Sequence, residues 1–485
     1  MSTSWPDHLP PRLIFGVILC TYLLLGGLYA AYTPAWQAPD EPAHYNYVRY
    51  LAESGRFPVL HYGDYPHAYL EQIKSARFPP DMSIDPIRYE FWQPPLYYVL
   101  AAPLYRLFGG ALLPLRLLSV ILGAGVVAMA YAIVLAWRPG DTTLALAAAA
   151  FVAFIPMHLT MVASVNNDPL AELLLAAVML LLIRLSKEAT WSPRGCRYLV
   201  AIGLLLGLGL VTKATVYIAI PLGVIALLLL KLRPAPLAGR TLALFGVALA
   251  LAIPWYVRNL ALYGWPDLLG VRNHDAVVVG QLRTEDYLAA VGGVTYLKNF
   301  TLTSFQSFWG QFGWMAVPMD RRIYLALALL SALIGAGCVL AVWRRRTAAG
   351  ADFVLIALWL TFTILIYVYY NLSLVQFQGR YLFPALIPIG ILAALGLREI
   401  TSRRRGWVAA GICGIAAGII AFTSLANGEL DKWGLLIAGG AALALIVRRW
   451  LPAWLDGWVL AAVFAGLAGL SLVSLFAFVV PYLHP

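Results

Sequence analysis

The sequence has few charged residues and few cysteines for its length. Only 12% of its 485 residues are Asp, Glu, Lys or Arg, whereas about a quarter is usual in a soluble globular protein. Apolar residues reach 61% and the mean hydropathy is +0.78, which is more apolar surface than a water-soluble fold of this size could bury. These values exclude a soluble enzyme, a nucleic-acid-binding domain and a disordered scaffold. They indicate an all-α protein that crosses a membrane many times.

Several motifs of catalytic and metal-binding proteins are also missing. The four cysteines, Cys20, Cys196, Cys338 and Cys413, show no CxxC spacing, so neither a disulfide framework nor a zinc site is predicted. The chain has no GxSxG motif, no Walker loop and no Gly-rich dinucleotide fingerprint. A cytoplasmic nucleotide-sugar site is therefore disfavoured, because no soluble α/β domain is present to carry it.

Apolar runs of spanning length recur along the whole chain. At about 20 residues per crossing they predict about 13 transmembrane helices in one integral membrane domain over residues 1–485. The segment 94–108 is apolar but short, so it is either a further span or a helix at the interface. The predicted spans cover residues 13–32, 112–137, 142–163, 169–185, 198–212, 214–230, 241–257, 323–343, 353–371, 381–397, 407–425, 433–447 and 457–480.

The distribution of positive charge decides between these two options. The net charge of +11 is spread over short connectors, which is the pattern that orients membrane proteins and not a nucleic-acid-binding face. If 94–108 does not cross, the basic connectors share one side, which is then the cytoplasm. We therefore expect a plasma-membrane protein with a cytoplasmic amino terminus, outward loops at about 34–111 and 259–322, and carboxy-terminal helices within 323–480. The basic connectors are 184–197, 231–240, 344–346, 398–405 and 448–449.

Acidic residues occur at two outward positions. Asp40 and Glu41 lie in WQAPDEPAHY, where a short amphipathic helix is predicted to begin after the first span. One carboxylate suffices to cap a helix, so the second indicates a function. Asp168, in the Asn-Asn-Asp-Pro turn, is either a helix cap or a second carboxylate of the same outer site. Such carboxylates stay ionised at neutral pH, which suits a base or a metal ligand.

Three cations are predicted at the outer ends of helices. Lys213 interrupts the apolar stretch GLVTKATVY, Arg258 ends an outward-going span, and Arg380 begins another. Each of them alone could extend to the lipid headgroups. Together they would suit an anionic lipid phosphate.

Four histidines also lie in the outward loops. A histidine with two carboxylates could hold a metal, but the spacing shows no HxxxH or HExxH motif. No cofactor is indicated with certainty, and a divalent metal is left open. The histidines are His44, His61, His67 and His274.

Several segments in this order resemble the GT-C type glycosyltransferases. The nearest branch includes the protein O-mannosyltransferases and the aminoarabinose transferase that modifies lipid A. The resemblance covers about the first half of the chain and continues more loosely through PWYVRNLALYG, SFWGQFGWM and QGRYLFPALIP. The segments that carry it are WQAPDEPAHYNYVRYLAESGRFPV, RYEFWQPPLYY, the Asn-Asp-Pro turn and GLVTKATVY.

The resemblance implies a GT-C fold with juxtamembrane helices in the first outward loop. It implies inverting transfer of a sugar from a polyprenyl-phosphate carrier to an acceptor hydroxyl on the outer face, with Asp40 as base. Glu41 would assist this base, and Asp168 would be a second acid. Residues implied to bind the donor phosphate are Lys213, Arg258, Arg380 and Tyr381. Residues implied to bind substrate are His44, Gln93, Trp309 and Trp314.

One position departs from that pattern. The relatives that modify lipid A have Lys where Gln93 stands in this chain, so one phosphate contact is absent or is supplied by Arg88. The expected partners are the lipid-linked sugar, membrane lipids and a glycan, lipid or protein acceptor, with no nucleic acid. The identity of the sugar cannot be read from the sequence.

Two other functions remain open at this point. A transporter or flippase of a lipid-linked sugar would need ionisable residues near the bilayer midplane and helices broken by Gly or Pro. A noncatalytic subunit could retain the same fold. The acids at the outer interface favour the enzyme.

Overall fold

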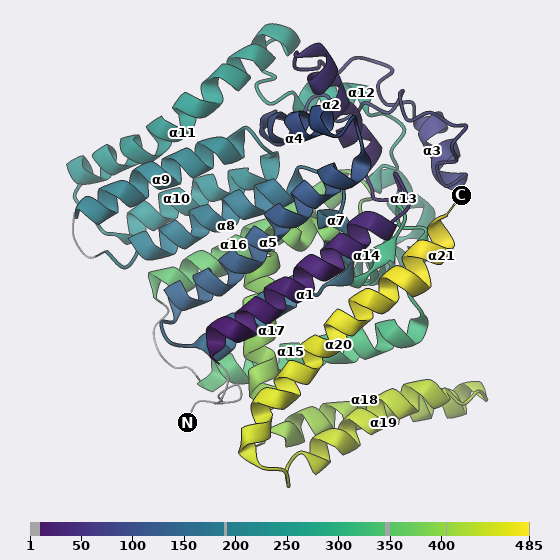
Figure 1. Cartoon of the computed structure of the whole chain (residues 1–485). Coiled ribbons are helices and arrows are strands. Elements are labelled where there is room, and N and C mark those ends of the chain that lie inside the picture. The colour runs from purple at the N-terminus through teal and green to yellow at the C-terminus, as the bar shows by residue number, and fades with distance from the viewer. Residues whose placement is uncertain (1–9, 189–191, 345–349, 404, 485) are drawn as a thin grey trace.

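A computed structural model describes residues 10–188, 192–344, 350–403 and 405–484 (Figure 1). The described chain is almost entirely helical, in agreement with the all-α class predicted from composition. Two short strands, β1 (Gln311–Phe312) and β2 (Val317–Pro318), form one antiparallel pair.

Long apolar helices make up a bundle. Eight described helices have the length and composition to cross a membrane, and a ninth results if the bent pair α6–α7 is one span. The eight are α1 (Pro11–Tyr32), α5 (Leu112–Trp137), α11 (Pro234–Tyr263), α15 (Arg321–Arg344), α16 (Ala351–Ser373), η2 (Gly379–Ala385) with α17 (Leu386–Ile400), α18 (Gly406–Asn427), and α20 (Asp456–Ser474) with η4 (Leu475–Val479) and α21 (Val480–Leu483).

Shorter helices occupy the other predicted spans. They are α6 (Thr142–Ala153), α7 (Pro156–Val162), α8 (Asp168–Leu185), α9 (Pro193–Leu210), η1 (Ala214–Ile218), α10 (Ala219–Leu229) and α19 (Lys432–Val447), and η3 (Ala453–Leu455) precedes α20. Each predicted span therefore coincides with one helix or with consecutive helices. The number of crossings does not follow from this, so about 13 stays a prediction.

The two long loops predicted to face outward contain further helices. The first holds α2 (Glu41–Ser54), α3 (His67–Ser75) and α4 (Leu96–Leu107), and the second holds α12 (Val271–Val277), α13 (Thr284–Val291) and α14 (Gly293–Trp309). The segment 94–108 forms α4, which is not among the candidate spans. Figure 1 shows α2, α3, α4 and α12 at one end of the bundle, where α21 also ends near α3.

Contacts link several of the basic connectors to neighbouring segments at the other end of the bundle. The ammonium group of Lys187 donates hydrogen bonds to the carbonyls of Ala136 and Trp137, at the end of α5. That the basic connectors all share one side of a membrane stays a prediction. Arg345, Arg346 and Arg404, which belong to the same connectors, lie outside the described residues. The ion pairs here are Lys187–Asp352, Arg398–Asp141 and Arg448–Asp456.

Two glycines allow α15 and α17 to pack with their backbones in contact. A Cβ atom on Gly337 would lie 2.1 Å from the carbonyl oxygen of Gly396. Even an alanine would therefore force the two helices apart.

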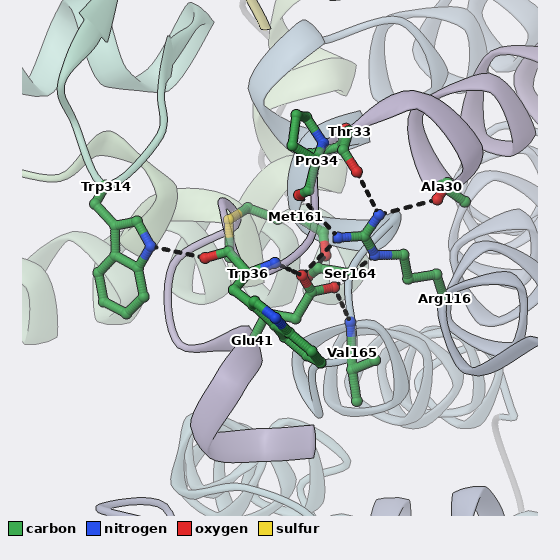
Figure 2. A network of polar contacts seen from close by, with 10 residues as sticks. All are labelled: Ala30, Thr33, Pro34, Trp36, Glu41, Arg116, Met161, Ser164, Val165 and Trp314. Carbon is green, nitrogen blue, oxygen red and sulfur yellow. Dashed lines mark hydrogen bonds and ion pairs between the residues drawn. The ribbon is translucent and has the colours of Figure 1, made fainter. Parts of the chain in front are cut away.

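A buried ion pair attaches the loop between α1 and α5 to the bundle (Figure 2). The guanidinium of Arg116 on α5 contacts both carboxylate oxygens of Glu41, at 2.7 Å and 2.6 Å. Arg116 also donates to the carbonyls of Ala30 and Thr33, at 3.0 Å and 2.7 Å. The end of α1 and the start of α2 are therefore held on α5 by one side chain.

The carboxylate of Glu41 has two further partners. It accepts hydrogen bonds from the backbone N–H of Trp36 at 3.1 Å and of Val165 at 3.2 Å. The carbonyl of Trp36 in turn accepts from the indole of Trp314 at 3.0 Å, as Figure 2 shows. The two long loops, at 34–111 and 259–322, and the turn before α8 are thus connected to this ion pair.

Replacing Arg116 with Met is expected to destabilise the protein strongly. The variant leaves the Glu41 carboxylate buried without its cation, and breaking a buried pair in this way costs about 3–5 kcal/mol. The thermal unfolding midpoint of the purified protein in detergent should fall well below that of the parent. Adding Glu41→Gln should recover part of the loss, because the double variant buries no charge.

The control for this prediction is Arg321→Met. Arg321 is 94% exposed and its nearest carboxylate oxygen, on Asp431, is 3.9 Å away. An Arg116→Met midpoint equal to that of the control would show that the buried pair does not stabilise the loop.

Candidate active site

Asp40 lies between α1 and α2 and does not cap the helix. Its φ angle is 69°, a left-handed conformation that Asp and Asn tolerate better than most residues. Its side chain accepts no hydrogen bond from the first turn of α2. Instead, Oδ2 pairs with Nη1 of Arg380 at 2.8 Å, and Oδ1 accepts from the Tyr89 hydroxyl at 2.8 Å.

These two contacts determine the ionisation of Asp40. Burial alone would raise the pKa of this carboxyl, but the charge of Arg380 and the hydrogen bond from Tyr89 lower it to about 2. Asp40 is therefore ionised at physiological pH. It can accept a hydrogen bond from a bound hydroxyl at any time, but it is a weak proton acceptor.

The second predicted acid forms a similar pair with another predicted cation. Asp168 is the first residue of α8, and its Oδ1 lies 2.7 Å from Nζ of Lys213. The sequence around Lys213 shows no neutralising partner, because Asp168 is distant along the chain. The structure thus places each of the two acids against one of the two cations.

His44 lies among these charges. Its Nδ1 is 2.8 Å from the Tyr98 hydroxyl, and the side chain is buried. Burial lowers the pKa of His44 to about 3, with the nearby Lys213 adding to this effect, so the imidazole is neutral. The charges that act on it belong to both pairs, Asp40–Arg380 and Asp168–Lys213, which places the two pairs around one region.

The guanidinium of Arg380 is oriented by a chain of side-chain amides. Its Nε donates to Oε1 of Gln378 at 2.7 Å, and Nε2 of Gln378 donates to Oε1 of Gln376 at 2.7 Å. Gln376 then donates to Gln281 at 3.3 Å. Because a guanidinium can only donate, it fixes the direction of every amide in the chain. Tyr381, the next residue, has its ring 5.3 Å from the guanidinium.

A third carboxyl lies at this site that was not predicted. Glu90 is in the segment before α4, and its Oε2 is buried without a hydrogen-bond partner among the described residues. Burial, together with the charge of Asp40, raises the pKa of Glu90 to about 7. Its position in RYEFWQPPLYY, beside Tyr89, was the only sequence signal that could have identified it.

Other predicted residues have structural partners away from the two pairs. Both carboxylate oxygens of Glu41 bind Arg116, so this fully buried side chain does not share the partly exposed position of Asp40. Trp309 is buried in the apolar core, and the Trp314 indole binds the Trp36 carbonyl. These contacts favour positioning roles.

The remaining predicted residues lie nearer the loops. Gln93 is buried, and its Oε1 accepts from Asn167 at 3.3 Å, next to Asp168. Arg258 donates to the carbonyl of Pro58 and lies over the ring of Trp255, at 4.4 Å from its centroid.

Two further sequence predictions concern Arg88 as a phosphate contact and a divalent metal site. Arg88, the alternative phosphate contact, is exposed and donates to the Asp85 carbonyl at 2.7 Å. Within the part of the chain that the structure describes, no group of three or more His, Cys, Asp or Glu side chains could hold a metal ion. What the site offers is the ionised carboxylate of Asp40, the carboxylate of Asp168, the Glu90 carboxyl with a pKa of about 7, and two cations.

Comparison with solved structures identifies the fold. ArnT from Cupriavidus metallidurans matches with a TM-score of 0.56 in the structure bound to undecaprenyl phosphate, at 17% identity, covering 96% of this chain and 77% of that one. Its apo structure matches with a TM-score of 0.56 at 18% identity, covering 96% and 76%. The Archaeoglobus fulgidus oligosaccharyltransferase with a tethered acceptor peptide gives 0.45 at 13% identity, covering 92% and 55%. The likeness to ArnT shows the GT-C fold.

Sequence comparison places the chain in a family. A search of curated proteins finds no match. A family model described as "Predicted membrane protein (DUF2142)" matches residues 92–389, which is more than half of the 485 residues. This range includes Asp168, Lys213 and Arg380, whereas Asp40 and Glu90 precede it. The chain belongs to this family of predicted membrane proteins, DUF2142.

Proposed function

We propose that this protein is a membrane glycosyltransferase. It transfers a sugar, with inversion, from a polyprenyl-phosphate carrier to an acceptor hydroxyl on the outer face of the plasma membrane. The observation that carries the proposal is the Asp40 carboxylate, held ionised between Arg380 and Tyr89 and close to the Asp168–Lys213 pair. The fold shared with ArnT, one structure of which contains undecaprenyl phosphate, supports it.

The reaction needs few groups. The acceptor oxygen attacks C1 of the sugar from the side opposite the phosphate, and the C1–O bond to the carrier breaks with its electrons passing to the phosphate. Asp40 acts as the base and accepts the proton of the acceptor hydroxyl. Arg380 and Lys213 stabilise the negative charge that develops on the leaving phosphate. A lipid phosphate is a good leaving group, so a general acid is not required.

The cations can bind a phosphate without releasing their carboxylates. Among the described residues, Arg380 uses Nε for Gln378 and Nη1 for Asp40, which leaves the N–H groups of Nη2 for a ligand. Lys213 uses one of its three N–H donors for Asp168. Hydrogen bonds from these cations to phosphate oxygens are charge-assisted and are therefore among the strong ones.

One observation favours the alternative, a transporter or flippase of a lipid-linked sugar. His158 on α7 and Glu172 on α8 form a buried pair, with Nε2 and Oε2 2.9 Å apart. Ionisable pairs inside membrane helices often serve transport. Liposomes containing the purified protein and a lipid-linked sugar separate the two functions. An enzyme makes glycosylated acceptor, whereas a flippase only moves the intact donor between leaflets.

The orientation can be tested by labelling introduced cysteines. In a variant without the four native cysteines, Asp286→Cys on α13 should react with a membrane-impermeant maleimide added to intact cells. Arg403→Cys should react only after the membrane is permeabilised, because basic connectors remain in the cytoplasm. Both side chains are exposed in the structure. The reverse pattern would place the site on the cytoplasmic face and contradict the proposal.

Lys213→Gln is expected to weaken binding of a polyprenyl-phosphate sugar by about tenfold or more. The substitution removes a charge-assisted contact worth roughly 1.5–3 kcal/mol. Donor affinity should be measured on the purified protein by quenching of tryptophan fluorescence. Lys298→Gln on α14 is the matched control, since this lysine is exposed. Equal donor affinities in the two variants would show that Lys213 serves only to neutralise Asp168.

Asp40→Asn should lower turnover by about a hundredfold or more, in line with loss of a general base. Asn tolerates the left-handed conformation at this position and can still accept the hydrogen bond from Tyr89. The variant should therefore fold, with a lower thermal midpoint because the nearly buried Arg380 loses its carboxylate, and donor binding should remain because the cations are intact. The measurement is product formation by the purified variant with lipid-linked sugar and acceptor, run beside its thermal midpoint. A parent-like rate would remove Asp40 from the mechanism.

A further inference from the structure

We propose that Glu90 is a second acid–base residue of this site, which binds the hydroxyl group of the acceptor and is the final destination of its proton. The inference rests on the proposed glycosyl transfer and names where the proton goes. During the step the acceptor O–H bond breaks, and the new O–C1 bond forms as the C1–O bond to the carrier phosphate breaks, with its electrons passing to the phosphate. The proton passes by way of Asp40 to the Glu90 carboxylate. No other reactant is needed, since the carboxyl returns its proton to water between turnovers.

The first argument is an unsatisfied buried atom. Oε2 of Glu90 is buried and has no hydrogen-bond partner among the described residues. Leaving such an oxygen without a partner costs about 1–3 kcal/mol, and more when the group is charged. A hydroxyl of a bound ligand would remove this penalty, either by donating to the carboxylate or by accepting from the protonated acid.

The second argument is the position of the residue. Glu90 directly follows Tyr89, whose hydroxyl holds Oδ1 of Asp40 at 2.8 Å. Its own carbonyl accepts from the N–H of Gln93 at 3.0 Å, which closes a tight turn before α4. The Gln93 amide contacts Asn167 beside Asp168. Glu90 is therefore held on a short, connected segment between the two predicted acids.

The third argument is the set of charges that face Glu90. Asp40 comes from the segment before α2, Asp168 from the start of α8, and Lys213 from the residue before η1. The phenols of Tyr98 on α4 and Tyr370 on α16 also face it. Burial and the two carboxylates raise the pKa of Glu90. The charge of Lys213 and a hydrogen bond from Gln93 lower this pKa, and the resulting value is about 7.

The two carboxyls thus differ in the way that acid–base partners do. The pKa of Asp40 is lowered to about 2, whereas that of Glu90 is raised to about 7. A proton taken up by Asp40 cannot remain there at neutral pH, but it can remain on Glu90. Two titratable groups whose environments separate their pKa values in this way commonly divide acid and base roles. Asp40 then takes the proton from the hydroxyl during the attack, and Glu90 retains it.

The test is the pH dependence of kcat/KM for sugar transfer by the purified full-length protein. A proton acceptor must be ionised, so the parent rate should fall about tenfold per pH unit below about 7. Glu90→Gln should lower the rate at pH 8 by about a hundredfold and abolish the pH dependence in this range. Asp40→Asn should shift it to lower pH, because the charge that raises the pKa of Glu90 is removed. Glu71→Gln, an exposed carboxyl on α3, is the control and should match the parent.

The outcomes distinguish the two proposals. A parent protein that transfers no sugar would overturn the proposed function, and the role of Glu90 with it. Sugar transfer by Glu90→Gln at the parent rate, or with the parent pH dependence, would overturn the role of Glu90 alone. An infrared difference spectrum gives a readout that is independent of activity. A protonated carboxyl band that titrates near pH 7 should be present in the parent and absent in Glu90→Gln, and its persistence in the variant would also overturn the assignment.

Discussion

The buried ion pair between Glu41 and Arg116 is the contact on which the geometry of the site depends. It joins the end of α1, the start of α2, α5 and the turn before α8. Asp40 directly precedes Glu41, and Asp168 lies three residues after Val165, whose N–H binds the same carboxylate. One bidentate contact therefore sets the positions of both acids. An exposed pair could not do this, because water would compete for both partners.

In this arrangement the two adjacent acidic residues, Asp40 and Glu41, have different partners. Glu41 is fully buried and binds Arg116, while Asp40 faces Arg380 and Tyr89. The sequence indicated that one carboxylate would suffice as a cap and that the other has a function, and that function stays a prediction. The sequence did not show that neither side chain caps α2. That outcome depends on Arg116, whose position relative to this loop follows only from the fold.

Much of the fold could be predicted because, in a chain with so few charged residues, a long apolar run is best explained as a membrane-spanning helix. The run 112–137 coincides with α5, and the short segment 94–108 with α4, outside the candidate spans. The run 142–163 was predicted as one span but consists of α6 and α7, which meet at 66°. Pro156 carried a signal for this break, because the residue before a proline is disfavoured in a helix. The mean hydropathy of the run 142–163 does not reveal such a bend, because both helices are apolar.

The candidate site was predicted in its residue types but not in its pairings. Asp40, Asp168, Lys213 and Arg380 were each identified from their position at a helix end. Which cation meets which acid depends on contacts between helices far apart in the sequence, and no local pattern encodes them. Glu90 was missed for the same reason, since its environment comes from α8, the residue before η1 and the segment before α2.

Under the proposed sugar transfer, the two acid–cation pairs would have a consequence for the end of the catalytic cycle. When the sugar leaves, the carrier changes from a phosphodiester with one charge to a phosphomonoester that carries about one more at neutral pH. A site of unpaired cations would hold this product more tightly than the donor and would be inhibited by it. Here each cation keeps a carboxylate of its own, and these carboxylates oppose the added negative charge. The pairing thus favours departure of the spent carrier without any exchange of ions with the surrounding water.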